Sequence, residues 1–203
     1  SNGNIDPYIQ AARHIADVMP KAESIDNFIN DHQGNKLIEL CAKLAIVQTI
    51  LEAEHERPLF VGNQRGTSRP DFNSLEGTWY GDFMKFLTLD CHKNDINQLF
   101  NNVSFIIFNY DRCVEHFIFH SLQNYYGIDP DEAAEIISGV KLFHPYGLVG
   151  QLPWQTGGDG TPFGSNDHLW QLLSLADQIK TFAERIEDEA EIHKMRQLVQ
   201  EAS

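Results

Sequence analysis

The chain has 203 residues, 42% of them hydrophobic and 22% charged, and a formal net charge of −14. This length and composition predict a single globular domain over residues 1–203. The strong negative charge argues against a general affinity for nucleic acid, and the apolar runs are far shorter than the ~20 residues of a membrane span. Cys41, Cys91 and Cys113 are isolated and form no C-x-x-C pair. This disfavours a structural zinc site or a disulfide framework and indicates a reducing, cytoplasmic setting.

The first quarter of the chain is predicted to be helical. Residues 1–4 are set aside as a remnant of expression or a frayed terminus, because the chain begins with Ser1 instead of an initiator Met. A helical pattern then runs from residue 5 to 19 and ends at Pro20, and Ser24 predicts a capped second helix. A third, long helix is predicted by apolar residues at three- and four-residue spacing, namely Leu37, Leu40, Cys41, Leu44, Val47, Ile50 and Leu51.

The middle of the chain is predicted to contain a loop and two shorter apolar segments. Residues 62–76 are rich in Gly, Asn, Ser and Arg, a composition typical of loops. The apolar residues that follow predict the buried face of a helix and then a second short segment. These are Trp79, Phe83, Phe86 and Leu87 for the first, and Ile96, Leu99 and Phe100 for the second.

Two strands with helices between them define the predicted fold class. The apolar runs 103–108 and 140–144 are typical of interior strands of a parallel sheet, and a helix is expected from Arg112 to about Tyr126. Asp129 followed by Pro130 marks the start of another helix. The chain is therefore expected to be a helix-rich α/β domain with a partial Rossmann-like parallel sheet flanked by helices. Residues 151–166 are expected to form a lid or a mobile insertion, and the chain from residue 167 onward a helical end.

Polar residues follow both predicted strands at the point where each strand ends. Asn109 and Asp111 follow the first strand, and His144 follows the second. Because ligands of open α/β sheets bind at the carboxyl ends of the strands, these residues are the candidate site. A purely structural interpretation also stands: Asp111 caps the next helix, and Pro145 and Gly147 form a tight turn. The two interpretations are compatible, since a cap at a strand end can also face a ligand.

Other motifs carry less information. His116 and His120 have a spacing that can hold a metal, but they project away from the predicted inner face of their helix, so a solvated face is expected. The glycine-rich run 157–160 lacks the Gly-Lys-Ser/Thr ending of a P-loop. The sequence contains no Gly-x-Ser-x-Gly and no His-Glu-x-x-His, which lowers the expectation of a serine hydrolase or zinc protease.

The segment from Phe108 to Glu115 resembles the Asn-Tyr-Asp-x-x-x-Glu element of bacterial sirtuin-like NAD-consuming domains. Ser24–Phe28, the helix from Lys43 to Glu54, and His144–Gly147 follow in the order that this family shows. The resemblance implies that NAD is bound as a substrate and that no metal takes part. It implies catalytic roles for Asn109, Asp111 and His144, with Asn109 positioning a water, and cofactor-binding roles for Asn109, Tyr110, Asp111, Tyr146 and Gly147.

The chain also departs from this family. The family histidine directly precedes a glycine, whereas Tyr146 holds that place here and His144 lies two residues earlier. Either His144 substitutes in a shifted register, or the histidine role is lost. The Gly-rich phosphate loop expected before residue 5, the last strand expected after Ala202, and the zinc module of the deacylases have no counterpart. The resemblance therefore implies a partial domain.

Three functions follow from these observations. The leading expectation is an NAD hydrolase that cleaves the nicotinamide–ribose bond. The alternative is a non-catalytic module of the same fold that binds NAD, a related nucleotide or a partner subunit, which Tyr146 and the missing glycine loop favour. The charged C-terminal helix offers an assembly surface, so a homo-oligomer is compatible with this alternative. A third interpretation, ranked lower, is an α/β domain whose resemblance to the family is superficial.

Overall fold

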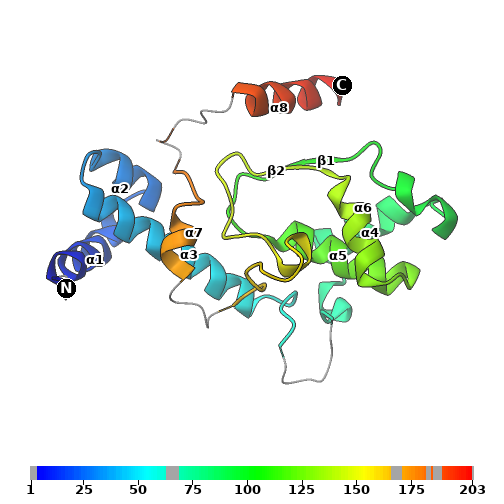
Figure 1. The fold of residues 1–203 in the computed structure, drawn as a ribbon, viewed down its shortest axis with the longest axis horizontal. Coiled ribbons are helices and arrows are strands. Elements are labelled where there is room, and N and C mark those ends of the chain that lie inside the picture. Colours follow the sequence, from blue (N-terminus) through cyan, green and yellow to red (C-terminus); the bar gives the residue numbers. More distant parts are fainter. Residues whose placement is uncertain (1–3, 63–68, 166–170, 182–183, 185–188, 203) are drawn as a thin grey trace.

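The computed structural model describes residues 4–62, 69–165, 171–181, 184 and 189–202. Over these residues the chain is helix-rich with a two-stranded parallel sheet (Figure 1). The helices are α1 (Asp6–Val18), α2 (Ile25–Asp31), α3 (Lys36–Glu56), α4 (Trp79–Thr88), α5 (Cys113–Tyr126), α6 (Pro130–Ser138), α7 (Leu172–Ala176) and α8 (Glu189–Glu201), and the strands are β1 (Ser104–Ile106) and β2 (Lys141–Phe143). No described helix combines the length and the apolar composition that crossing a membrane would require.

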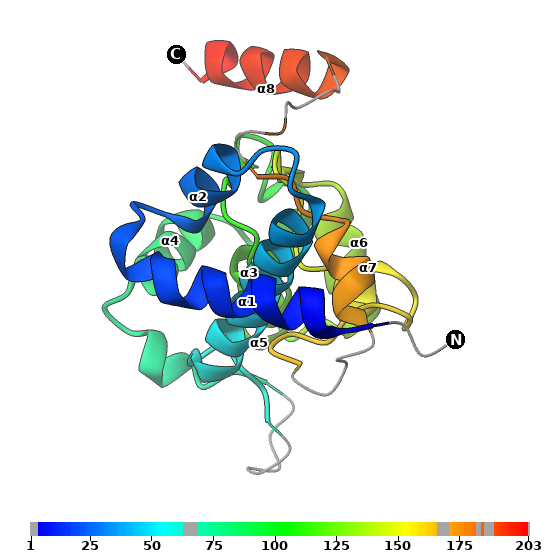
Figure 2. The same ribbon diagram turned by 90° about the vertical axis from the view of Figure 1, so that its left-hand side faces the viewer.

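The helices of the N-terminal part begin and end where the local sequence indicates. α1 gives way to a short 3-10 turn at Met19–Lys21, which contains Pro20. The Ser24 hydroxyl accepts a hydrogen bond from the Asn27 backbone N–H at 3.1 Å, so the predicted cap of α2 is confirmed. The long third helix is confirmed as α3, which lies between α1 and α7 (Figure 2).

The buried apolar side chains form two cores. The first core joins α1, α2, α3 and α7 and contains Ile15, Phe28, Ile46, Val47 and Ala176 among others. The second core joins α4, α5 and α6 and contains Leu87, Ile118, Leu122, Ala133 and Ile137 among others. Two stretches pass from one core to the other: Tyr110 and Val149 belong to the first core, and Cys113 and Leu152 to the second.

The two strands are adjacent and parallel, as predicted, and α5 and α6 connect them (Figure 1). Ser104 pairs with Lys141 and Ile106 with Phe143, and the Ile107 N–H extends the ladder by donating to the Phe143 carbonyl at 2.8 Å. Both strands are shorter than the predicted runs. They are also half-buried or exposed instead of interior, because no third strand among the described residues pairs with either edge.

The predicted apolar face of α4 is partly wrong. Trp79 is 53% exposed and Phe86 is 76% exposed, whereas Met84 and Leu87 are buried. The helix thus turns a different stripe toward the second core. The predicted loop at 62–76 contains a short 3-10 helix at Phe72–Leu75, and residues 63–68 lie outside the described part.

The predicted helical end of the chain is interrupted. α7 ends at Ala176, and Ile179 then forms an antiparallel bridge with Gly147 while the Lys180 N–H donates to the Tyr146 carbonyl at 2.7 Å. These bonds hold residues 179–180 beside the segment after β2. Within this predicted helical end, residues 167–170, 182–183 and 185–188 lie outside the described part of the chain.

Candidate functional site

The residues after the two strands lie together at the carboxyl end of the sheet. His144 Nδ1 is 3.2 Å from the Asn109 carbonyl oxygen, so the end of β2 contacts the segment after β1. The Asn109 side-chain amide donates to the Asp111 carboxylate. Asn109 is exposed and Asp111 is half-buried, which leaves both side chains within reach of a ligand at this edge.

The predicted cap is wrong in its detail: the N-cap of α5 is Arg112, without a side-chain cap bond, and Asp111 fixes the chain one residue earlier. Its Oδ1 accepts a hydrogen bond from the Cys113 N–H, the first residue of α5, at 3.0 Å. Asn109 Oδ1 accepts from the Tyr110 N–H at 3.0 Å. The chain leaving β1 is therefore fixed by two side chains that are themselves candidates for ligand contact.

His144 is held by a buried carboxylate on α5. Its Nε2 lies 2.7 Å from Glu115 Oε1, and the side chains are 5% and 3% exposed. Burial lowers the pKa of His144, but the hydrogen bond and charge of Glu115 outweigh it, so the net pKa is raised. The other carboxylate oxygen, Glu115 Oε2, is buried without a hydrogen-bond partner in the described part of the chain. His144 and Glu115 thus form a rigid pair beneath the strand ends.

The remaining predicted binding residues have different surroundings. Tyr110 is buried, its hydroxyl donates to the Lys180 carbonyl at 2.8 Å, and burial raises its pKa. Tyr146 is half-buried with its ring centroid 6.3 Å from that of Phe108. Gly147 has φ +81°, and a Cβ there would lie 1.9 Å from the Gln178 carbonyl oxygen. Close packing of the backbone against residues 178–179 therefore explains this glycine without a ligand.

A buried ion pair supports the site from below, and sequence reasoning missed it. Arg112 is 0% exposed and Glu54, on α3, is 1% exposed. Arg112 Nη2 and Nε donate to the Glu54 carboxylate at 2.5 and 3.1 Å, a bidentate arrangement, and the Arg112 backbone N–H donates to it at 2.9 Å. Arg112 Nη1 donates to the Thr161 carbonyl at 2.6 Å, and the Gly164 N–H donates to Glu54 at 3.0 Å. The pair therefore ties α3, the start of α5 and the 150–164 segment together.

The expected solvated face at His116 and His120 is wrong. His116 is buried, its Nε2 lies 3.0 Å from the Leu59 carbonyl, and its ring stacks on Phe163. Burial lowers the pKa of His116 well below its usual range and that of His120 to about 4. Segments that follow α3 and η5 (Pro153–Gln155) cover this side of α5, a contact that helix periodicity does not reveal. Among the described residues, no three His, Cys, Asp or Glu side chains are grouped so as to hold a metal.

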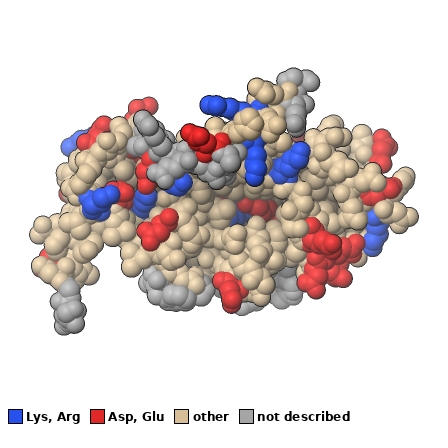
Figure 3. All heavy atoms as spheres, turned by 45° about the horizontal axis from the view of Figure 1, so that its top comes forward, with Lys and Arg blue, Asp and Glu red and all other residues tan. Residues whose placement is uncertain are grey.

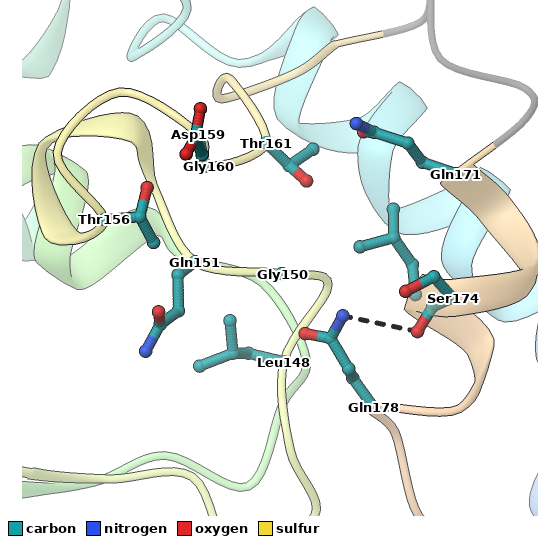
Figure 4. Close-up of a pocket in the computed structure, with 11 residues that line it drawn as sticks. Leu148, Gly150, Gln151, Thr156, Asp159, Gly160, Thr161, Gln171, Ser174 and Gln178 are labelled. Atoms are coloured by element: carbon teal, nitrogen blue, oxygen red, sulfur yellow. Dashed lines mark hydrogen bonds between the residues drawn. The ribbon is translucent and has the colours of Figure 1, made fainter.

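A cavity with a volume of about 600 Å³ lies next to this edge of the fold (Figure 4). Its walls come from the 148–151 segment, the loop around Asp159, and α7 with its flanking residues. Gln178, just after α7, donates to the Ser174 carbonyl at 3.3 Å. The loop expected to be a lid thus forms one wall. Its described lining contains one carboxylate and no Lys or Arg, and it does not include Asn109, Asp111 or His144. Such a lining suits hydroxyl and amide groups better than a phosphate.

The surface charge gives phosphate no general attraction. Figure 3 shows a dense group of acidic side chains toward the right of one face, with basic side chains dispersed over the same face.

In comparisons with protein-family models, curated proteins and solved structures, nothing matches this chain. The function of this chain must therefore be inferred from the geometry and chemistry of the site itself.

Proposed function

We propose that this chain is a Rossmann-like NAD-binding domain that hydrolyses the nicotinamide–ribose bond. The observation that carries the proposal is the meeting of Asn109, Asp111 and the His144–Glu115 pair at the carboxyl ends of two parallel strands. Open α/β sheets bind nucleotides at this edge. The connection of β1 to β2 through α5 and α6 supports the Rossmann-like assignment.

Cleavage of the nicotinamide–ribose bond does not require an acid to protonate the leaving group. The positively charged nicotinamide group leaves as a neutral molecule with the electron pair of the C–N bond, and water then adds to the ribose carbon and releases one proton to bulk solvent. The transition state is positive at the ribose, so a carboxylate close by stabilises it. Asp111 supplies that carboxylate, and the exposed Asn109 amide orients the water. His144 is a positioning residue, because both ring nitrogens are already engaged, by Asn109 and Glu115.

The alternative, a module of the same fold that binds a nucleotide without cleaving it, has its own support. The Asn109 amide already donates to Asp111, and the described lining of the cavity beside the strand ends offers no cation to a pyrophosphate. Backbone N–H groups would have to hold the phosphates. This arrangement accounts for the nicotinamide-ribose half of NAD better than for the pyrophosphate.

Nicotinamide release from NAD, followed by chromatography, tests the proposal. We expect release by the chain and at least a hundredfold loss in Asn109→Ala, the loss typical when one oriented polar group is removed from a reaction centre. Asn101→Ala is the matched control, since Asn101 is exposed in a turn before β1. Equal release by folded Asn109→Ala would exclude the assigned role. Binding of ADP-ribose by calorimetry without any release would favour the non-catalytic alternative.

A further inference from the structure

A second cavity, of about 320 Å³, lies beside α5 and shares no lining residue with the proposed NAD site. Its wall includes Phe119 and His120 of α5, Trp154 of η5, Phe163, and Val61 after α3. This volume lies at the lower end of the range for small-molecule sites. None of Asn109, Asp111 or His144 lines it, so it is separate from the strand-end site.

The aromatic rings around this cavity are arranged in two parallel pairs. Phe119 stacks on Trp154 with ring centroids 4.7 Å apart and an interplanar angle of 4°. His116 stacks on Phe163 at 4.0 Å and 5°. Flat, mutually supported rings offer π faces and edges to a planar guest, and aromatic contacts favour such offset-stacked or edge-to-face geometry.

The lining is electrically neutral near pH 7. Burial lowers the pKa of both His116 and His120, that of His120 to about 4, so neither ring is charged. Asp, Glu, Lys and Arg are absent from the described lining residues. An ionic ligand would lose its hydration here and gain no counter-charge, so the cavity selects against ions.

One polar group of the lining lacks a partner. The Trp154 Nε1–H is buried and makes no hydrogen bond within the described part of the chain. Buried donors are almost always paired in folded proteins, and an unpaired one is unfavourable. A ligand with a suitably placed acceptor would satisfy it.

We infer that this cavity binds a neutral, planar heteroaromatic molecule whose carbonyl accepts a hydrogen bond from Trp154. The two-ring lactam carbostyril is a suitable probe, because it is flat, uncharged and carries such a carbonyl. Indole is the matched comparison, since it has a similar size and a donor but no acceptor. Calorimetry of the whole chain, without NAD, should show binding of carbostyril and weaker binding of indole.

Variants locate the site. Trp154→Phe keeps an aromatic ring and removes the N–H, and we expect roughly tenfold weaker carbostyril binding. Val61→Phe fills the cavity and leaves the Trp154 side chain unchanged, so carbostyril binding should also be lost in this variant. It provides a second test should Trp154→Phe fail to fold. Trp79→Phe is the control, because Trp79 is exposed on α4.

Asn109→Ala separates this inference from the proposed function, since it should bind carbostyril as the unmodified chain does. Weaker binding in both cavity variants, with unchanged binding in the two controls, supports the inference. It is overturned by absence of binding to the unmodified chain, by full affinity in either folded cavity variant, or by indole binding as tightly as carbostyril.

Discussion

At the scale of single residues, Arg112 and Glu54 are where the fold depends most on one contact. Both side chains are almost fully excluded from solvent, and the carboxylate accepts hydrogen bonds from the guanidinium, the Arg112 N–H and the Gly164 N–H. Forming such a pair costs desolvation, so its net contribution is small, but removing one partner leaves a buried charge without compensation. The pair therefore acts as a requirement for the structure more than as a source of stability.

Glu54→Gln should lower the free energy of unfolding by about 3–5 kcal/mol, because Arg112 keeps its charge and loses its counter-ion. Urea denaturation followed by circular dichroism measures this change. Glu39→Gln is the control: Glu39 pairs with Lys36 on the exposed side of α3, and a loss of roughly 0–1 kcal/mol is expected there. Equal losses in the two variants would show that the buried pair has no special role.

The His144–Glu115 pair should make stability depend on pH. The pKa of His144 is raised in the folded chain, and its value in the unfolded chain is about 6.5. The contribution of the charged pair is therefore complete below about pH 6.5 and is lost as the pH rises through the higher folded value. The difference in unfolding free energy between the unmodified chain and Glu115→Gln should shrink over that interval. Urea titrations at successive pH values measure it, and a constant difference would contradict the assignment.

At the scale of elements, helix ends are set by short-range signals. Asp129 accepts a hydrogen bond from the Glu132 N–H at 2.9 Å, and Pro130 occupies the first position of α6. The cap satisfies a backbone donor that the helix itself leaves unpaired. Because α6 packs Ala133 and Ile137 into the second core, its start also positions the chain that enters β2.

Asp129→Ala should destabilise the chain by about 0.5–2 kcal/mol, since the first turn of α6 loses its cap. Asp129→Asn should stay within a few tenths of a kcal/mol, because asparagine caps about as well as aspartate. Thermal unfolding of the three proteins side by side measures both effects. If the alanine and asparagine variants were equally unstable, charge near the helix start and not the cap would explain the loss.

The difference between short-range and long-range contacts explains how much could be predicted from the sequence. Ser24 and Asp129 accept hydrogen bonds from N–H groups three residues away, so the local sequence was sufficient to predict both helix starts. Glu54 and Arg112 lie 58 residues apart, and nothing local marks either as buried. At the candidate site, the meeting of Asn109 and His144 was predictable from strand order, whereas Glu115 as the partner of His144 was not.

Errors in the predicted helices have the same origin. His116 and His120 fall on the polar side by periodicity, yet the Leu59 carbonyl and the Phe163 ring cover His116. The helix expected from residue 167 onward stops because residues 146–147 compete for the backbone groups of 179–180. Periodicity describes one helix alone, and contacts from distant segments override it.

At the scale of the whole molecule, the two cores share their boundary. The stretches 110–113 and 149–152 run from one core into the other, and the Arg112 guanidinium bonds the second stretch through the Gly150 carbonyl at 3.4 Å. Both crossing stretches are largely buried, so they join the two cores firmly. We expect it to unfold in one cooperative transition, as single domains usually do.

Ile118→Ala tests this coupling, since Ile118 is fully buried in the second core. The variant should lose about 2–5 kcal/mol, from lost burial and the cavity left behind. Amide hydrogen exchange, read by mass spectrometry, should show equal loss of protection in α6, next to the change, and in α1, in the other core. Leu173→Ala, at a side chain that is 57% exposed, should alter neither. Loss confined to α6 would mean that the cores unfold separately, and Arg112 would then anchor the 150–164 segment without joining the two halves.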